Sequence, residues 1–201
     1  MKPILAKTQR SLCLLTAGFA ALTLSVSATA VEMTAFDLSA DGNRYVGERS
    51  NGRVVQVRSD KAIGSLTPNI WNVVYHDPDA TLKAIEVKFA AGKKLDVTRP
   101  IRLLEPITKG DEPLTKDQLK IDSDKAVEIA SREPLLEKLT LKSARLVLER
   151  RSHDDGTPVW KVRLWAAKLK NPNDSADVGE VVISADDGKV LKSDLKPDRI
   201  D

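Results

Sequence analysis

Apolar and polar residues alternate along two stretches near the C-terminus. Residues 160–165 read WKVRLW, and residues 180–185 read EVVISA. A period of two predicts strands of an antiparallel sheet with one face on a core. Asp187-Gly188 is a strong tight-turn signal, and residues 145–150 form an earlier apolar strand. The pattern therefore predicts a three- or four-stranded antiparallel meander over residues 144–193.

A helix is predicted in front of this meander. Asp122 or Ser123 can cap its N-terminus, and Asp124 suits the positive end of the helix dipole. Apolar residues follow at near-helical spacing until Pro134 limits continuation. This part of the chain therefore reads as an α-β-β-β unit, in which one helix covers one side of the sheet and leaves the other side free.

The same order of signals occurs earlier in the chain. Thr-Pro precedes IWNVVY at 70–75 as it precedes VWKVRL at 159–164, and GKKL at 92–95 matches GKVL at 188–191. The shared order predicts an α+β fold of antiparallel β-meanders in tandem pseudo-repeat. We place the two repeats at residues 31–110 and 111–201 and expect one cooperative unit.

The first repeat lacks an equally good helix signal. Residues 35–52 are rich in Gly, Asn and Asp, which favours turns and short strands, and residues 53–59 read as its first strand. Prolines and a glycine make residues 98–120 a linker, within which 101–104 is a candidate strand. We therefore expect the first repeat to be degenerate and poor in helix.

Residues 1–30 have the pattern of a Sec signal peptide. Basic residues precede an uncharged apolar run, and Ala28-Thr29-Ala30 predicts cleavage after Ala30. We expect a periplasmic or secreted protein with no stable membrane insertion after cleavage. The leader holds three basic residues and no acid, so it accounts for the net charge of +3. The remaining chain is neutral. It therefore lacks the excess of basic residues that a nucleic-acid-binding protein needs.

Few residues indicate reaction chemistry. His76 and His153 each precede aspartate, but both lie in turn-like stretches, HDPD at 76–79 and HDDG at 153–156. Aspartate, proline and glycine serve backbone geometry there, so we predict no metal site. The leader holds Cys13, the chain's one cysteine, and no nucleophile or nucleotide-binding motif appears. We expect a protein that is not an enzyme and needs no cofactor.

Trp165 is the strongest candidate for a binding residue. If Trp160 faces the helix-covered core, alternation places Trp165 on the opposite face with Lys161 and Arg163, and Glu149 and Arg151 join from the neighbouring strand. An aromatic residue among arginines is typical of an interface anchor. The other interpretation, favoured by the scarcity of exposed aromatics, makes Trp165 part of a core between the repeats.

The second repeat resembles the PepSY family. The resemblance rests on DSDKAVEIASREP at 122–134, PVWKVRLWA at 158–166 and VVISADDGKVL at 181–191. It implies an antiparallel sheet carrying a helix, in an exported protein linked to regulation or inhibition of peptidases. It brings no catalytic residues.

The sequence thus predicts an exported, non-catalytic module that binds a protein partner, with a peptidase as the partner implied by the resemblance. Two alternatives stay open. One is a small-ligand binder with a cleft between the repeats around Trp165 and Tyr75, and the other is a structural component of the cell envelope.

Overall fold

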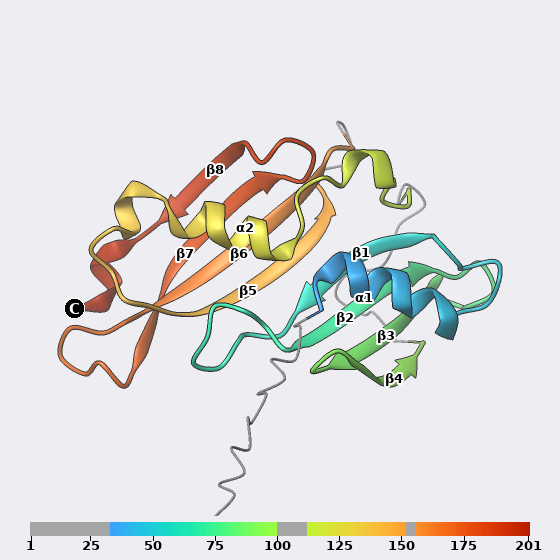
Figure 1. The fold of residues 1–201 in the computed structure, drawn as a ribbon, viewed down its shortest axis with the longest axis horizontal. Helices are drawn as coiled ribbons and strands as arrows, with labels where there is room; N and C mark the ends of the chain where they lie inside the picture. The colour runs from blue at the N-terminus through green and yellow to red at the C-terminus, as the bar shows by residue number, and fades with distance from the viewer. Residues whose placement is uncertain (1–32, 100–111, 152–155) are drawn as a thin grey trace, which may run out of the picture. The chain divides into compact units, whose positions relative to one another are not determined.

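The computed structural model describes residues 33–99, 112–151 and 156–201, drawn in colour in Figure 1. Glu32–Asp201 form one compact unit. The predicted signal peptide, the candidate strand at 101–104 and His153 lie outside the described residues. None of the helices described is both long and apolar enough to cross a membrane.

The first half of this unit consists of a helix, a 3-10 turn and four strands. These are α1 (Ala35–Gly42), η1 (Asn43–Tyr45), β1 (Val54–Ser59), β2 (Ile70–His76), β3 (Ala84–Ala90) and β4 (Lys93–Thr98). The second half has the same order with more 3-10 turns: η2 (Lys116–Gln118), α2 (Ser123–Ser131), η3 (Pro134–Leu136), β5 (Leu141–Arg150), β6 (Pro158–Ala167), β7 (Ser175–Ser184), β8 (Val190–Leu195) and η4 (Pro197–Ile200).

All the described strands belong to one antiparallel sheet. Its order is β4-β3-β2-β1-β5-β6-β7-β8, so the first strand of each half lies at the centre. Strands β1 and β5 join the halves through the register Val57↔Leu148 and Arg58↔Val147. The predicted α+β class with antiparallel strands is confirmed.

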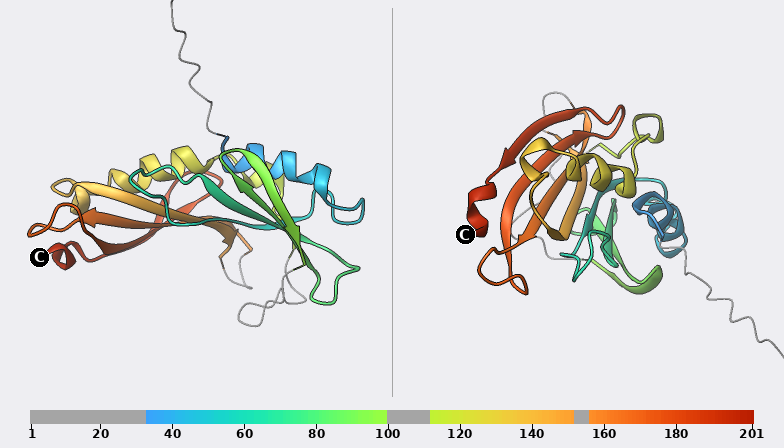
Figure 2. Two further views of the ribbon diagram at one scale, coloured as in Figure 1. Left: turned by 90° about the horizontal axis from the view of Figure 1, so that it is seen from below. Right: turned by 60° about the vertical axis from the view of Figure 1, so that its left-hand side comes forward.

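Both helices cover the same face of the sheet (Figures 1 and 2). The apolar side chains of that face form the core, where Trp71 and Trp160 are 3% and 0% exposed. Each indole nitrogen donates to a backbone carbonyl, Trp71 to Pro68 at 2.9 Å and Trp160 to Ile121 at 2.7 Å. These bonds satisfy the one polar atom of each buried ring. We refer to the opposite side of the sheet as the helix-free face.

The prediction that the first half lacks a helix is wrong. Residues 35–42 form α1, which begins at a capping box: Thr34 Oγ1 accepts from the Asp37 N–H, and the Asp37 carboxylate accepts from the Thr34 N–H. The Gly, Asn and Asp residues that suggested turns end the helix rather than prevent it. Each half has four strands, because the GKKL and GKVL segments continue as β4 and β8. This is the larger of the two strand numbers predicted for the second meander, and one strand more than the α-β-β-β unit.

Tyr75 and Gly42 fasten α1 to the sheet. The Tyr75 hydroxyl, on a fully buried side chain of β2, donates to the Ser39 carbonyl of α1 at 2.8 Å. Burial, with a smaller contribution from the Asp41 charge, raises the pKa of Tyr75 far above its usual value, so this hydroxyl stays a donor. Gly42 leaves room for it, because a Cβ at position 42 would overlap the Tyr75 oxygen.

Candidate functional site

Trp165 lies on the helix-free face, as alternation predicts. It follows the core residue Leu164 on β6 and stands opposite Ser143 of β5. The ring is partly buried, and the Lys61 ammonium lies 4.4 Å from its centroid. Lys61 comes from the β1–β2 loop, which is held here by a 2.9 Å bond from the Ala62 N–H to the Ala144 carbonyl. A cation over an indole face is attracted by the ring quadrupole.

Two arginines stand directly across from each other beside Trp165. The β5–β6 register pairs Arg145 with Arg163, and both side chains are exposed. Arg163 Nε lies 3.6 Å from the Asp177 carboxylate of β7, whereas no ion pair among the described residues involves Arg145. Like charges directly opposite on a sheet are destabilising. We call Lys61, Arg145, Arg163 and Trp165 the Trp165 patch.

Lys161 and Glu149 lie next to the patch and pair with each other. Lys161 Nζ is 2.5 Å from Glu149 Oε1, and Gln56 Nε2 donates to Glu149 Oε2 at 2.7 Å. These contacts connect β6, β5 and β1 across the join of the two halves. The side chains border an open depression of about 170 Å³ on the helix-free face, which is also lined by Arg58, Arg145, Val147, Arg163 and Glu180. Three of the five predicted site residues, Glu149, Lys161 and Arg163, therefore line one depression, and Trp165 lies on the same face without lining it.

Arg151 does not join them. It follows the end of β5 as an exposed bend residue, its N–H donates to the Thr157 carbonyl at 3.0 Å, and it does not line the depression. Strand β5 ends at Arg150, so the alternation of side chains that would place Arg151 on the helix-free face stops one residue before it. The neighbouring Arg150 is the residue that sequence reasoning missed: its guanidinium donates to the carbonyls of Glu112, Pro113 and Gly156. No local pattern distinguishes this structural arginine from an exposed one.

The structure contradicts two of the sequence-based interpretations. Trp165 is not part of a core between the halves, because neither the main core on the helix-bearing face nor the smaller buried cluster of Val55, Val74 and Ala84 includes it. A cleft around Trp165 and Tyr75 is also wrong, because Tyr75 is buried in the core under α1. Two adjacent residues of one strand point to opposite faces, so the side-chain parity along β2 and β6 separates the two rings.

The HDPD segment holds a backbone turn. Asp77 is 4% exposed; its carboxylate accepts from the Asp79 N–H at 3.0 Å and from Arg99 Nε at 3.2 Å. Burial acts to raise the pKa of Asp77, but the hydrogen bonds from Asp79 and Arg99 outweigh it and lower this pKa below its usual value. Within residues 33–99, 112–151 and 156–201, no three or more His, Cys, Asp or Glu side chains are grouped to hold a metal.

Comparison with known proteins returns no matching family model, no matching curated protein and no matching solved structure.

Proposed function

We propose that this chain is an exported, non-catalytic binding module, and that its Trp165 patch docks an acidic surface of a partner protein. The observation that carries the proposal is the Arg145–Arg163 opposition on an exposed sheet face. It works against folding stability, so a role outside folding accounts for it best. A partner carboxylate placed between the two guanidinium groups would neutralise this repulsion and accept bidentate hydrogen bonds.

The rest of the patch suits the same partner. Tryptophan and arginine are the residues most enriched at binding hot spots. Trp165 offers a partly buried ring, and Lys61 adds a third positive charge above it. The adjacent Lys161–Glu149 pair is internally neutralised. Arg163 has Asp177 at 3.6 Å and stands opposite Glu180 of β7, so the positive field of the patch comes mainly from Lys61 and Arg145, which form no ion pair among the described residues. Such a field steers an acidic partner to this face and loses strength as salt rises.

We further propose that the two halves are related copies of one PepSY-like unit. Each half is a helix followed by four strands, and Trp71 and Trp160 occupy corresponding positions in the core. The start of β4 lies within GKKL and the start of β8 lies within GKVL, which is the correspondence that the repeated sequence predicts. The resemblance of the second half to the PepSY family makes a co-exported peptidase the first partner class to test. The leader pattern at 1–30 supports a periplasmic or secreted location.

The test is a capture experiment followed by an activity assay. The chain from Val31 is immobilised and exposed to the exported proteins of its own organism, and every captured protein is identified, purified and assayed for peptidase activity with and without the free chain. The proposal expects an acidic peptidase whose activity falls on binding. If the purified captured proteins do not bind the chain directly, or bind without any being a peptidase, the regulator proposal is wrong.

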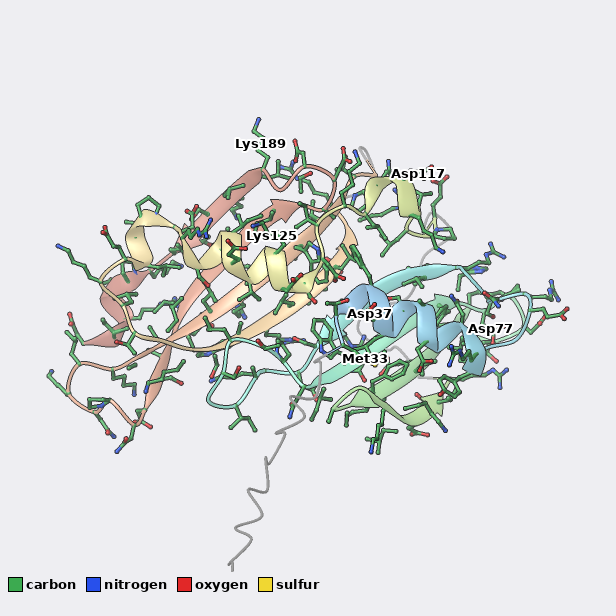
Figure 3. All side chains as sticks on the ribbon, viewed as in Figure 1. Met33, Asp37, Asp77, Asp117, Lys125 and Lys189 are labelled. Atoms are coloured by element: carbon green, nitrogen blue, oxygen red, sulfur yellow. The ribbon has the colours of Figure 1, made fainter. Side chains whose placement is uncertain are left out.

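Charge reversal locates the binding face. Arg145→Glu/Arg163→Glu should weaken direct binding at least tenfold, whereas the control Lys138→Glu/Lys189→Glu, with the same change in net charge, should leave it within twofold. Lys138 and Lys189 are exposed, and Figure 3 shows Lys189 projecting away from the ribbon at the β7–β8 hairpin. Equal loss in both variants would assign binding to net charge and not to the patch.

A further inference from the structure

A cavity of about 340 Å³ opens on the helix-bearing side, where α1 faces the segment that leads into α2. Its floor consists of Val54, Val57 and Leu148 from β1 and β5, and its walls are Phe36, Leu114 and Leu119. Leu148 and Val57 are 0% and 1% exposed, so the floor is part of the folded core. Side chains from both halves are needed to form it, and the Leu114 N–H fixes one wall by donating to the Val54 carbonyl at 2.7 Å.

The size and lining indicate a small molecule as occupant. Ligand sites of about 300–1,000 Å³ with mostly apolar walls and few polar groups enclose compact organic molecules. This cavity is at the lower end of that range. A protein segment would need a longer groove, whereas a short alkyl chain or a single aromatic system matches the volume.

The cavity has one charged group of each sign among its lining residues, Asp37 and Lys116. Figure 3 labels Asp37 on α1. Asp37 is already engaged, because its Oδ2 accepts from both the N–H and the hydroxyl of Thr34 in the capping box. Lys116 is exposed and has no ion pair among the residues the structure describes. Asp37 and Lys116 keep opposite charges, so the lining as a whole has no net charge; Lys116 is the charged group that is not already engaged by other described residues and can bind a ligand headgroup.

We propose that this cavity binds a compact apolar monoanion, such as a medium-chain alkyl carboxylate, with the tail on the Val54–Val57–Leu148 floor and the carboxylate on Lys116. This site is on the sheet face opposite the Trp165 patch and does not depend on the proposed partner. Binding would hold α1 and the segment 114–119 together, and so would couple the two halves. The apolar tail supplies affinity through burial, and the lysine selects the sign of the headgroup.

The test is calorimetric titration of the chain from Val31 with decanoate below its micelle-forming concentration, and with decylammonium and decanol under the same conditions. We expect saturable 1:1 binding of decanoate, at least tenfold weaker binding of decanol, and weaker binding still of decylammonium. Lys116→Glu should weaken decanoate binding at least tenfold, and Lys138→Glu, an exposed lysine away from the cavity, should leave it unchanged.

Ala40→Trp tests the location, because Ala40 lines the cavity from the exposed side of α1 and we expect a tryptophan there to fill it. The variant should retain its far-ultraviolet circular dichroism and lose decanoate binding. If Ala40→Trp does not fold, the decanoate affinity of Lys116→Glu alone tests the proposal. Absence of saturable decanoate binding to the wild type, equal binding of decylammonium, or full binding by Lys116→Glu would each overturn the proposal.

Discussion

The carboxylate of Asp122 caps two helices: α2, which it precedes in the chain, and α1, which contains Phe36. Its Oδ1 accepts from the Ser123 N–H of α2 at 2.6 Å and from the Phe36 N–H of α1 at 3.2 Å. Ser123 Oγ adds a third bond, from the Ala35 N–H at 3.0 Å. The two helices thus meet at their N-termini, and one acid satisfies backbone donors that neither helix can satisfy alone. The positive ends of both dipoles point at this carboxylate.

Replacing Asp122 by alanine should therefore weaken both helix N-termini. We expect the free energy of unfolding to fall by about 2 kcal/mol, since one lost cap costs about 1 kcal/mol and a second N–H loses its partner. Asp122→Asn keeps an oxygen acceptor and is the matched control. Denaturant unfolding at pH 7 measures both variants, and equal stability of wild type and Asp122→Ala would show that the shared cap is unimportant.

The pH dependence of the same pair gives a second measurement. Burial raises the pKa of Asp122 despite the hydrogen bonds it accepts, so the folded state binds this proton more tightly than the unfolded chain does. The stability that comes from the tighter proton binding of Asp122 in the folded state is fully present below the pKa of Asp122 in the unfolded chain. It is lost as pH rises through the pKa of Asp122 in the folded state. Asp122→Asn should thus be at least as stable as wild type at pH 7, and this advantage should shrink at pH 3. An advantage that grows on acidification would contradict the raised pKa.

Ser59 lies at the join between the two halves, where β1 pairs with β5, and its replacement gives a third prediction. Its hydroxyl, on a side chain that is 1% exposed, accepts from the buried Leu146 N–H at 2.9 Å and so extends the short β1–β5 ladder. Ser59→Ala leaves that N–H without its partner and should cost about 1–3 kcal/mol of unfolding free energy. Ser193→Ala, which removes an exposed bond to Glu133, should cost less than about 0.5 kcal/mol. Equal effects in chemical denaturation would mean that Ser59 does not hold the join.

Gly42 and Tyr75 should show strong coupling. Gly42→Ala adds a Cβ that overlaps the Tyr75 hydroxyl and must displace α1, while Tyr75→Phe removes the oxygen and one buried hydrogen bond. Each single change should cost about 1–2 kcal/mol. The double variant should be more stable than the sum of the two predicts, by about 1 kcal/mol. A double-mutant cycle with strictly additive effects would contradict the contact.

The Arg145–Arg163 opposition predicts an unusual gain in stability. Arg145→Glu replaces repulsion by attraction across the β5–β6 pair and should raise the free energy of unfolding by about 0.5 kcal/mol at low salt. The gain should decrease as salt screens the exposed charges. Thermal unfolding at two salt concentrations measures it. A variant that is less stable than wild type at both would show that Arg145 is a structural residue and would weaken the binding proposal.

Local pattern predicted much of this fold because the relevant physics is local. Alternation around Trp160 and Trp165 follows from strand geometry alone, and it placed Lys161, Glu149 and Arg163 on the correct face. The helix at Ser123–Ser131 followed from its cap and apolar spacing. Helix α1 was missed because its composition resembles a turn, although Thr34 followed three residues later by Asp37 was a readable capping signal.

The remaining features depend on contacts between distant residues. The pairing of β1 with β5, which turns two meanders into one sheet, rests on partners such as Ser59 and Leu146 that no local window contains. The sharing of Asp122 by two helices is equally non-local. Both had to come from the structure, and so did the Arg145–Arg163 opposition, because register decides which strand residues face each other.

Hydroxyl-radical footprinting of the chain alone and in complex with its captured partner tests whether the partner binds the helix-free face at Trp165. Trp71 and Trp160 are buried and serve as internal references, while partly buried Trp165 reports on the helix-free face. If the partner docks on the Trp165 patch, oxidation of Trp165 should slow at least fivefold in the complex, while exposed residues of α1 and α2 react unchanged. Unchanged oxidation of Trp165, with protection on the two helices instead, would place the partner on the opposite face and contradict docking on the Trp165 patch.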